Sequence, residues 1–193
     1  MDDVIFAGTE KLAEKGFAEV YLNFEVDEKK FNGNSEISIG RKLFRDGTSE
    51  YFMNGLNCRL LDIQEFLSEV NTVSAKHGIN PAHLLGLIAS ESGFNPKAQN
   101  PDTDAAGLLQ FKPEVAERYG TTVDKILKMS RVEQMRYVDM YLKETLPNNP
   151  SLGQLYTSTL MPTYATERPD FELMAKDARY GSGNAQMLSL IHI

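Results

Sequence analysis

The hydrophobic period of the sequence changes near Leu60, and this change limits the folds that the chain can adopt. Between Phe17 and Val26 apolar and polar residues alternate, which is the pattern of a β-strand with one apolar face. The apolar members are Val20, Leu22, Phe24 and Val26. After Asp62 the apolar residues recur at helical spacing up to Gly78, namely at Ile63, Phe66, Leu67, Val70 and Val73. We therefore expect an α+β fold, with an N-terminal antiparallel β segment followed by an all-α domain.

Local signals predict where the turns and helices of these two parts begin and end. Asp46-Gly47 and Asn54-Gly55 are turn signals, and the first suits a hairpin. Asn80 is a favoured N-cap, Pro81 suits the first helical position and Gly93 is a natural stop, so we expect a helix over residues 81–92. Further helix starts are expected at Pro113 (closed by Gly120) and at two capping-box sequences, Ser130 to Glu133 and Ser151 to Gln154.

Glu91 lies on the apolar face of the helix expected over residues 81–92. It shares that face with Leu84, Leu87 and Ile88, and it stands near the C-terminal end of the helix. Desolvation and the negative end of the helix dipole both disfavour the ionised carboxylate, so we expect a raised pKa for Glu91. A carboxylic acid that keeps its proton near neutral pH is what glycosidic bond cleavage requires.

Composition narrows the classes of function. The net charge of −7 argues against nucleic acid as the main ligand, because phosphate binding requires clustered Lys and Arg. The single cysteine, Cys58, excludes an intramolecular disulfide, and the Cys and His spacing fits no zinc site. We expect no metal and no cofactor. No apolar run approaches the ~20 residues of a membrane-spanning helix, and the acidic start at Met1 is not that of a signal peptide.

Four ordered blocks of the helical part carry a resemblance to a known family. They are Glu91 to Pro96, Ala106 to Phe111, Met129 to Gln134, and Leu155-Tyr156 followed by Pro162. With them, residues 68–187 resemble the lysozyme-like lytic transglycosylases, especially the phage-associated branch. The resemblance implies a lysozyme-like fold, a cleft for peptidoglycan glycan strands and a protein that acts on the bacterial cell wall.

The same resemblance implies roles for single residues. Glu91 matches the catalytic acid, Ser92 the residue beside it, and Gln110 the substrate-contacting glutamine. The tyrosine of the family's later Ala-Tyr-Asn motif is missing, and Tyr156 is our substitute, with Tyr164 second. The alternatives are turn or cap hydrogen bonding for Ser92 and Gln110, and a core position for Tyr156.

The implied reaction cleaves the β-1,4 bond between N-acetylmuramic acid and N-acetylglucosamine and forms a 1,6-anhydro product. In it Glu91 serves as acid and then as base. Inverting hydrolysis, as in the goose-type lysozymes that share the fold, requires a second carboxylate. Asp102 and Asp104 are the only acids between the first two blocks.

The N-terminal part resembles a second family, the structural-maintenance-of-chromosomes (SMC) ATPases. The carrying segments are Asp3 to Gly8, Gly16 to Val20, Leu43 to Tyr51, Asn54-Gly55 and Asp62 to Glu65. They imply that residues 1–67 correspond to a piece of the head domain. No phosphate-binding loop is present, and Gly33 to Lys42 has the wrong spacing, so we expect no ATP binding. A non-enzymatic SMC fragment is thus the alternative function, and we expect these strands to play no part in the chemistry of Glu91.

The last six residues, 188–193, resemble a translated sequencing adapter. We therefore expect a natural sequence that continues past this point, and a junction between two unrelated families that arose as a chimera. Both families place a helix over residues 62–77, so a chain joined there can still fold.

Overall fold

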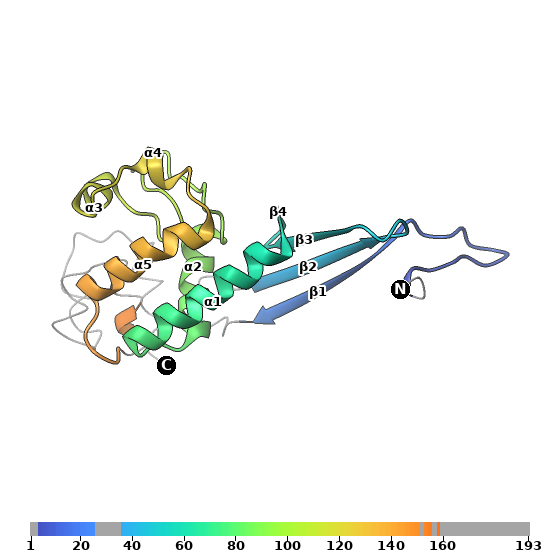
Figure 1. Cartoon of the computed structure of the whole chain (residues 1–193), viewed down its shortest axis with the longest axis horizontal. Coiled ribbons are helices and arrows are strands. Elements are labelled where there is room, and N and C mark those ends of the chain that lie inside the picture. Colours follow the sequence, from blue (N-terminus) through green and yellow to red (C-terminus); the bar gives the residue numbers. More distant parts are fainter. Residues whose placement is uncertain (1–3, 26–35, 151–152, 156–157, 159–193) are drawn as a thin grey trace.

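The computed structural model describes residues 4–25, 36–150, 153–155 and 158. Its first part is an antiparallel four-stranded sheet in the order β1-β2-β3-β4. The strands are β1 (Phe17–Glu25), β2 (Glu36–Phe44), β3 (Ser49–Met53) and β4 (Leu56–Cys58). Helices follow, and the sheet projects away from the helical body (Figure 1). The expected α+β class, with an antiparallel β segment before the helices, is confirmed.

Both turn signals form hairpins. Asn54 and Gly55 have positive φ angles of 46° and 76°, and they form the two-residue loop between β3 and β4. Two successive positive φ angles define the type I′ turn, which matches the twist of the flanking strands. Between β2 and β3, Asp46 Oδ1 accepts hydrogen bonds from the amide and the hydroxyl of Thr48.

The apolar face of β1 is exposed, which the alternation did not predict. Val20, Leu22 and Phe24 retain 58%, 59% and 49% of their accessible surface. Their neighbours across the register are Arg41, Ile39 and Ile37 of β2, and of these only Ile37 is buried. The expectation of a strand was correct, and its apolar face is exposed because β1 lies at the sheet edge and beyond the helices (Figure 1).

The helices are α1 (Leu60–His77), α2 (Pro81–Ser92), α3 (Pro113–Arg118), α4 (Val123–Ile126) and α5 (Arg131–Thr145). Helices α1, α2 and α5 follow the expected signals, whereas α3 ends at Arg118, before Gly120, and α4 was not predicted. Gly78 ends α1 in the left-handed region at φ 66°, and the Ser130–Glu133 capping box starts α5. Gly153 to Leu155 are helical, whereas Ser151 of the other capping box lies outside the described residues. Helix α1 runs unbroken through residue 67, where we expected one domain to end.

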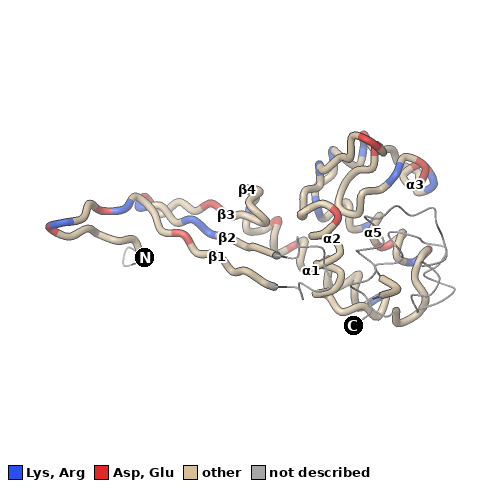
Figure 2. Tube along the Cα trace, turned by 180° about the vertical axis from the view of Figure 1, so that it is seen from behind, with Lys and Arg blue, Asp and Glu red and all other residues tan. Residues whose placement is uncertain are grey.

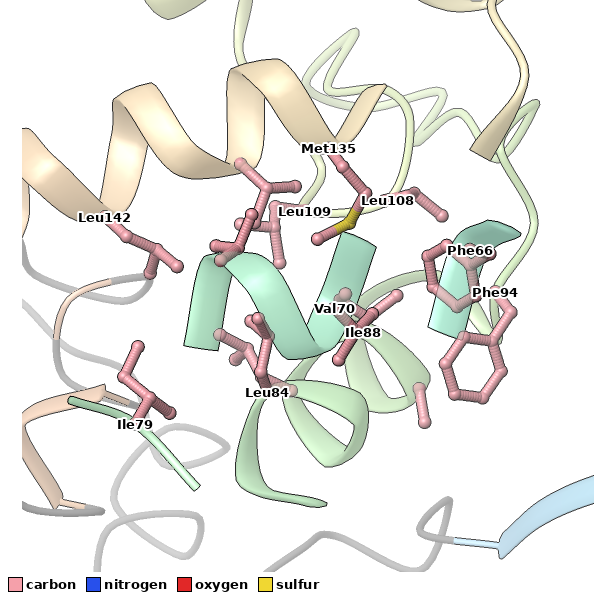
Figure 3. Packing of buried hydrophobic residues seen from close by; sticks show 14 of the residues in the cluster. Phe66, Val70, Ile79, Leu84, Ile88, Phe94, Leu108, Leu109, Met135 and Leu142 are labelled. Atoms are coloured by element: carbon pink, nitrogen blue, oxygen red, sulfur yellow. The ribbon is translucent and has the colours of Figure 1, made fainter. Parts of the chain in front are cut away.

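One apolar cluster joins the sheet to the helices. Its core is formed by α1, α2 and α5, with Phe66 against Phe94 in an edge-to-face contact at 5.9 Å between ring centroids (Figure 3). Ile37 of β2 and Met53 of β3 belong to the same cluster and are 4% and 1% exposed. The inner end of the sheet is therefore part of the helical core.

Charges on the described chain are mixed in sign. Lys and Arg are interspersed with Asp and Glu along the sheet and the helices (Figure 2). One cluster joins α1 to α5, where Asp139 accepts from Lys76 at 2.5 Å and contacts His77 at 2.7 Å. None of the helices formed by the described residues is long and apolar enough to cross a bilayer. Within the same residues no three Asp, Glu, His or Cys side chains are grouped to hold a metal ion.

Candidate functional site

A cleft with a volume of about 800 Å³ lies over the C-terminal end of α2. Its walls come from three parts of the chain: the end of α2, the loop that follows it, and the β3–β4 hairpin. The lining residues include Glu91, Ser92, Asn95, Asp102 and Gln110, with Asn54 and Leu56 from the hairpin. The candidate site is therefore built from several segments of the chain and not only from the helix that carries Glu91.

The position of Glu91 follows from how α2 begins and ends. Asn80 Oδ1 accepts a hydrogen bond from the amide of Ala82 at 2.9 Å, which fixes the first turn. Gly93 stops the helix with φ 58°, a conformation that favours glycine. Leu84, Leu87 and Ile88 are fully buried on the expected face, while Glu91 is half-buried and opens onto the cleft. A carboxyl group is thus held at the boundary between the core and solvent.

Ser92 and Gln110 line the cleft with Glu91, but their side chains donate hydrogen bonds to backbone carbonyls. The Ser92 hydroxyl donates to the carbonyl of Ile88 at 3.1 Å. Gln110 Nε2 donates to the carbonyls of Gly107 and Ala98 at 3.0 and 3.3 Å. These bonds match the alternative reading of Ser92 and Gln110 as residues that stabilise a helix end and a turn. The Gln110 bonds use Nε2, so Oε1 is the end of that amide suited to accept a hydrogen bond from a ligand.

Gln134 holds the two cleft loops together, a role that was not predicted from the sequence. Its side chain is fully buried. Its Oε1 accepts from the amide of Leu108 at 2.8 Å, and its Nε2 donates to the carbonyls of Pro96 and Ile126 at 2.7 and 2.9 Å. A Cβ at Gly107 would lie 2.5 Å from Gln134 Oε1, so the glycine is required for this close approach. Gln134 therefore ties the loop after Glu91 to the loop of Gln110.

Arg131, at the start of α5, links the same loop to the sheet. Its Nε donates to the carbonyl of Phe94 at 2.7 Å. Its positive charge also interacts with Cys58 in β4, where burial raises the pKa of the thiol and Arg131 partly offsets that rise. The Met129–Gln134 block thus has a structural basis: Ser130 and Glu133 cap the helix, and Arg131 and Gln134 fix the cleft loops.

Tyr141 is the described tyrosine that interacts electrostatically with Glu91. Burial raises the pKa of Tyr141 to about 12, and the charge of Glu91 adds to the effect. The Tyr141 hydroxyl donates to the carbonyl of Ser158 at 2.7 Å. Tyr156 and Tyr164, the tyrosines we selected from the sequence, lie outside the described residues. Helix α5 carries both Tyr137 and Tyr141, and no sequence motif distinguishes Tyr141.

The cleft contains a second carboxylate. Asp102 lines it and is exposed, whereas Asp104 is exposed and is not among the lining residues. The loop that carries them is ordered by backbone hydrogen bonds between Asn100 and Ala105 and between Asp104 and Asn100. Of the two acids considered for hydrolysis, Asp102 is the one that the structure brings to the site.

The β3–β4 hairpin also reaches the cleft, because Asn54 and Leu56 line it. That the strands play no part in the chemistry of Glu91 stays a prediction. The hairpin reaches this position because Met53 and Ile37 anchor the inner end of the sheet in the helical core.

The fold and the cleft define a helical body with a half-buried glutamate at the end of an α-helix, joined to an antiparallel sheet. Comparison with known families relates part of the helical body to one class of enzymes. Residues 69–136 match the family described as Transglycosylase SLT domain, which associates this region with transglycosylase activity in general. Glu91, Ser92, Gln110 and Gln134 fall inside the match, whereas Asn54, Leu56 and Tyr141 fall outside it.

The chain is also similar to the chromosome partition protein Smc. It is 50% identical over 113 residues to Smc of Mycolicibacterium paratuberculosis, which covers 58% of this chain and 9% of that protein. Smc of Myxococcus xanthus is 36% identical over 125 residues, or 61% of this chain and 10% of that protein. The chain thus spans only about a tenth of the length of these relatives. Both alignments are longer than the 67 residues that carried the SMC resemblance, so they overlap the transglycosylase match.

Solved SMC heads give a weaker structural likeness. The SMC head domain from Thermotoga maritima has a TM-score of 0.28 and 28% identity, over 45% of this chain and 38% of that chain. An SmcHead bound to the C-winged helix domain of ScpA has a TM-score of 0.29 and 18% identity, over 75% of this chain and 37% of that chain. The resemblance of the chain to two families is confirmed. The TM-scores of 0.28 and 0.29 are too low to define a common fold with the SMC heads.

Proposed function

We propose that the helical part, residues 68–187, is a lysozyme-like lytic transglycosylase domain that cleaves peptidoglycan glycan strands. The single observation that carries this proposal is Glu91, half-buried at the end of α2 in a cleft of about 800 Å³, within the residues that match the transglycosylase family. A cleft of this size with a half-buried carboxyl group that can donate a proton suits a sugar substrate.

In the proposed reaction Glu91 donates its proton to the glycosidic oxygen between N-acetylmuramic acid and N-acetylglucosamine. The bond from the anomeric carbon to that oxygen breaks through an oxocarbenium-like state. The 6-hydroxyl of the muramic acid then bonds to the anomeric carbon, and the Glu91 carboxylate takes the hydroxyl proton. The product is a 1,6-anhydro sugar, and Glu91 returns to its protonated form.

In this proposal the cleft loops serve to position the substrate. Ser92 and Gln110 contact the sugars. The hydrogen bonds of Gln134 to Leu108 and Pro96 keep the neighbouring loops in place. Fixed loops favour catalysis, because reacting groups must be held within a fraction of an ångström of their productive geometry.

Digestion of purified murein, followed by mass spectrometry of the released muropeptides, tests this function. We expect anhydro-muramic products from the native chain and none from Glu91→Gln. Glu117→Gln is the matched control, because Glu117 is exposed on α3 and away from the cleft. Reducing-end products would favour the lysozyme reaction, and the absence of any cleavage would refute both.

The identity with Smc favours a second candidate, a non-enzymatic fragment of a chromosome-organising ATPase. The exposed apolar residues Val20, Leu22 and Phe24 of β1 are consistent with a sheet that pairs with a complementary head fragment. A pull-down with such a fragment tests this candidate. Leu22→Lys should weaken the pairing, and a native chain that fails to pair would exclude it.

A further inference from the structure

We propose that β1 (Phe17–Glu25) is a docking edge for a second copy of the chain, which adds its own β1 antiparallel to the first about a twofold axis at Tyr21. The two four-stranded sheets then join into one continuous sheet. The inference goes beyond the transglycosylase activity proposed above and does not depend on it, because none of the described residues that line the cleft of Glu91 belongs to β1.

The outer edge of β1 presents backbone groups for pairing. β1 is the outermost strand of the sheet, and among the described residues no other strand pairs with its outer side (Figure 1). The carbonyl of Gly16 accepts from the amide of Arg45 at 3.2 Å, so the even-numbered positions turn their backbone groups toward β2. Because these directions alternate along an antiparallel ladder, the backbone groups of Glu19, Tyr21 and Asn23 point to the outer edge.

β1 lacks the features that usually protect an edge strand. Its nine residues contain no Lys, Arg or Pro. Its register with β2 advances residue by residue along the whole strand, without a bulge. The exposed side chains of Val20, Leu22 and Phe24 lie along the same strand. A long, regular and apolar edge strand of this kind is a template for pairing with another strand.

The strand is complementary to itself. The register that overlaps two copies of β1 over their whole length places Tyr21 opposite Tyr21. It also places Val20 opposite Leu22 of the second copy, and Glu19 opposite Asn23 of the second copy. Apolar residues therefore meet apolar residues on one face, and a carboxylate meets an amide on the other. Matched cross-strand pairs of these kinds stabilise neighbouring strands, so the chain itself supplies a fitting partner strand.

The polar side chains of β1 are arranged for this contact. The hydroxyl of Ser38 donates to Asn23 Oδ1 at 2.8 Å, so the Nδ2 end of Asn23 carries the hydrogen-bond donors. The carboxylate of Glu19 lies 3.3 Å from Lys42 Nζ, which holds it on the same face of the sheet. In the joined sheet this carboxylate accepts from Asn23 of the second copy, and the twofold axis repeats the pair.

The ring of Tyr21 leaves the twofold axis clear for the approach of two backbones. A Cβ at Gly40 of β2 would lie 2.4 Å from Tyr21 Cε1, so the ring lies over Gly40 and leans away from the outer edge. Antiparallel pairing also reverses the second copy. The sheet projects away from the helices (Figure 1), so the two helical bodies lie at opposite ends of the joined sheet.

Sedimentation of the full chain over a range of concentrations tests the pairing, and we expect the average mass to rise from one chain to two. Glu19→Pro removes an outward N–H without removing a bond to β2, and Val20→Lys places a charge opposite Leu22 of the second copy. Each variant should raise the dissociation constant of the dimer roughly tenfold or more. Asn57→Lys is the matched control, because Asn57 is exposed on β4 at the opposite edge, and it should leave the dissociation constant unchanged.

Disulfide formation tests the register. Positions 20 and 22 of the two copies form a pair without hydrogen bonds between them, with Cα atoms about 4.5 Å apart, which a disulfide can span. With Cys58→Ser as the background, a mixture of Val20→Cys and Leu22→Cys chains should form a mixed disulfide faster than either chain forms one with itself. A mixture of Val20→Cys and Asn57→Cys chains should not.

Three results would overturn the inference. The first is a native chain that stays monomeric at all concentrations. The second is a dimer that survives both β1 variants while circular dichroism shows that they are folded. The third is a monomeric chain that binds a complementary head fragment through β1, which would assign the edge to that partner. Murein cleavage is measured separately, so the proposed function stands or falls on its own assay.

Discussion

Removing the Gln134 side chain should destabilise the whole helical body. Gln134 is fully buried and makes three strong hydrogen bonds to backbone groups of three separate segments, at Leu108, Pro96 and Ile126. Gln134→Ala removes the side chain beyond Cβ, including the carboxamide that makes these bonds. The amide N–H of Leu108 and the carbonyl of Pro96 then lose the bond to Gln134, and the carbonyl of Ile126 keeps only its bond from the amide of Met129.

The magnitude follows from these three contacts. A net loss of about 1 kcal/mol for each hydrogen bond, with a larger cost for any partner left buried and unsatisfied, gives a total of about 3–5 kcal/mol. That is a large part of a typical unfolding free energy of about 5–15 kcal/mol. At roughly 2–4 °C per kcal/mol for a chain of this size, the melting temperature should fall by about 10 °C.

Thermal and urea denaturation followed by circular dichroism measure this effect. Gln64→Ala is the matched control, because Gln64 is exposed on α1, and it should change the stability by less than about 0.5 kcal/mol. Gln134→Glu should be as unstable as Gln134→Ala at neutral pH and should recover as the pH falls, because a protonated carboxyl can again donate. A Gln134→Ala chain whose unfolding free energy lies within about 1 kcal/mol of the control would refute this account of the Gln134 hydrogen bonds.

Three further predictions concern the core and the cleft. Phe94→Ala removes a fully buried ring that packs on Phe66, and it should cost about 3–5 kcal/mol in urea titrations; a cost below about 1 kcal/mol would contradict this packing. Because burial and Glu91 raise the pKa of Tyr141 from the ordinary 10.0 to about 12, the unfolded chain loses the tyrosine proton first, so stability should fall as the pH rises from about 10 towards 12. Tyr141→Phe should remove part of that slope in denaturation curves between these pH values, and an unchanged slope would count against it. Asp102→Asn should leave anhydro-product formation within about twofold of the native rate if Glu91 is both acid and base, whereas a loss comparable to that of Glu91→Gln would assign Asp102 a catalytic role.

The ends of the elements could be predicted from the sequence, because they depend on local chemistry. Asn80, Pro81 and Gly93 bound α2 as expected, and Gly78 ends α1. Asn54-Gly55 forms a tight turn because asparagine and glycine both adopt positive φ. Each of these features involves residues within a few positions of one another, where backbone sterics and single hydrogen bonds decide the outcome.

Features that depend on long-range contacts were not predicted. The alternation in β1 indicated a strand but could not show that its apolar face lacks a cover among the described residues. The role of Gln134 depends on carbonyls that lie far away in the sequence, such as that of Pro96. The approach of Asn54 to the cleft depends on Met53 docking in the helical core. Periodicity records which face is apolar, but it does not record what packs on that face.

The candidate site could be predicted only in part from the sequence. Glu91, Ser92 and Gln110 were selected from the sequence and line one cleft. The raised pKa of Glu91 and the catalytic and binding roles stay predictions. Tyr156 lies outside the described residues, while Tyr141 was found only through its burial and its interaction with Glu91.

The most direct test of the central claim is murein digestion in water labelled with heavy oxygen, followed by mass spectrometry of the products. If Glu91 acts alone as acid and base, the muramic acid closes on its own 6-hydroxyl, and the products carry the anhydro mass without heavy oxygen. Hydrolysis would instead place one heavy oxygen on each new reducing end. Labelled reducing ends from the native chain, or unchanged product from Glu91→Gln, would contradict the account.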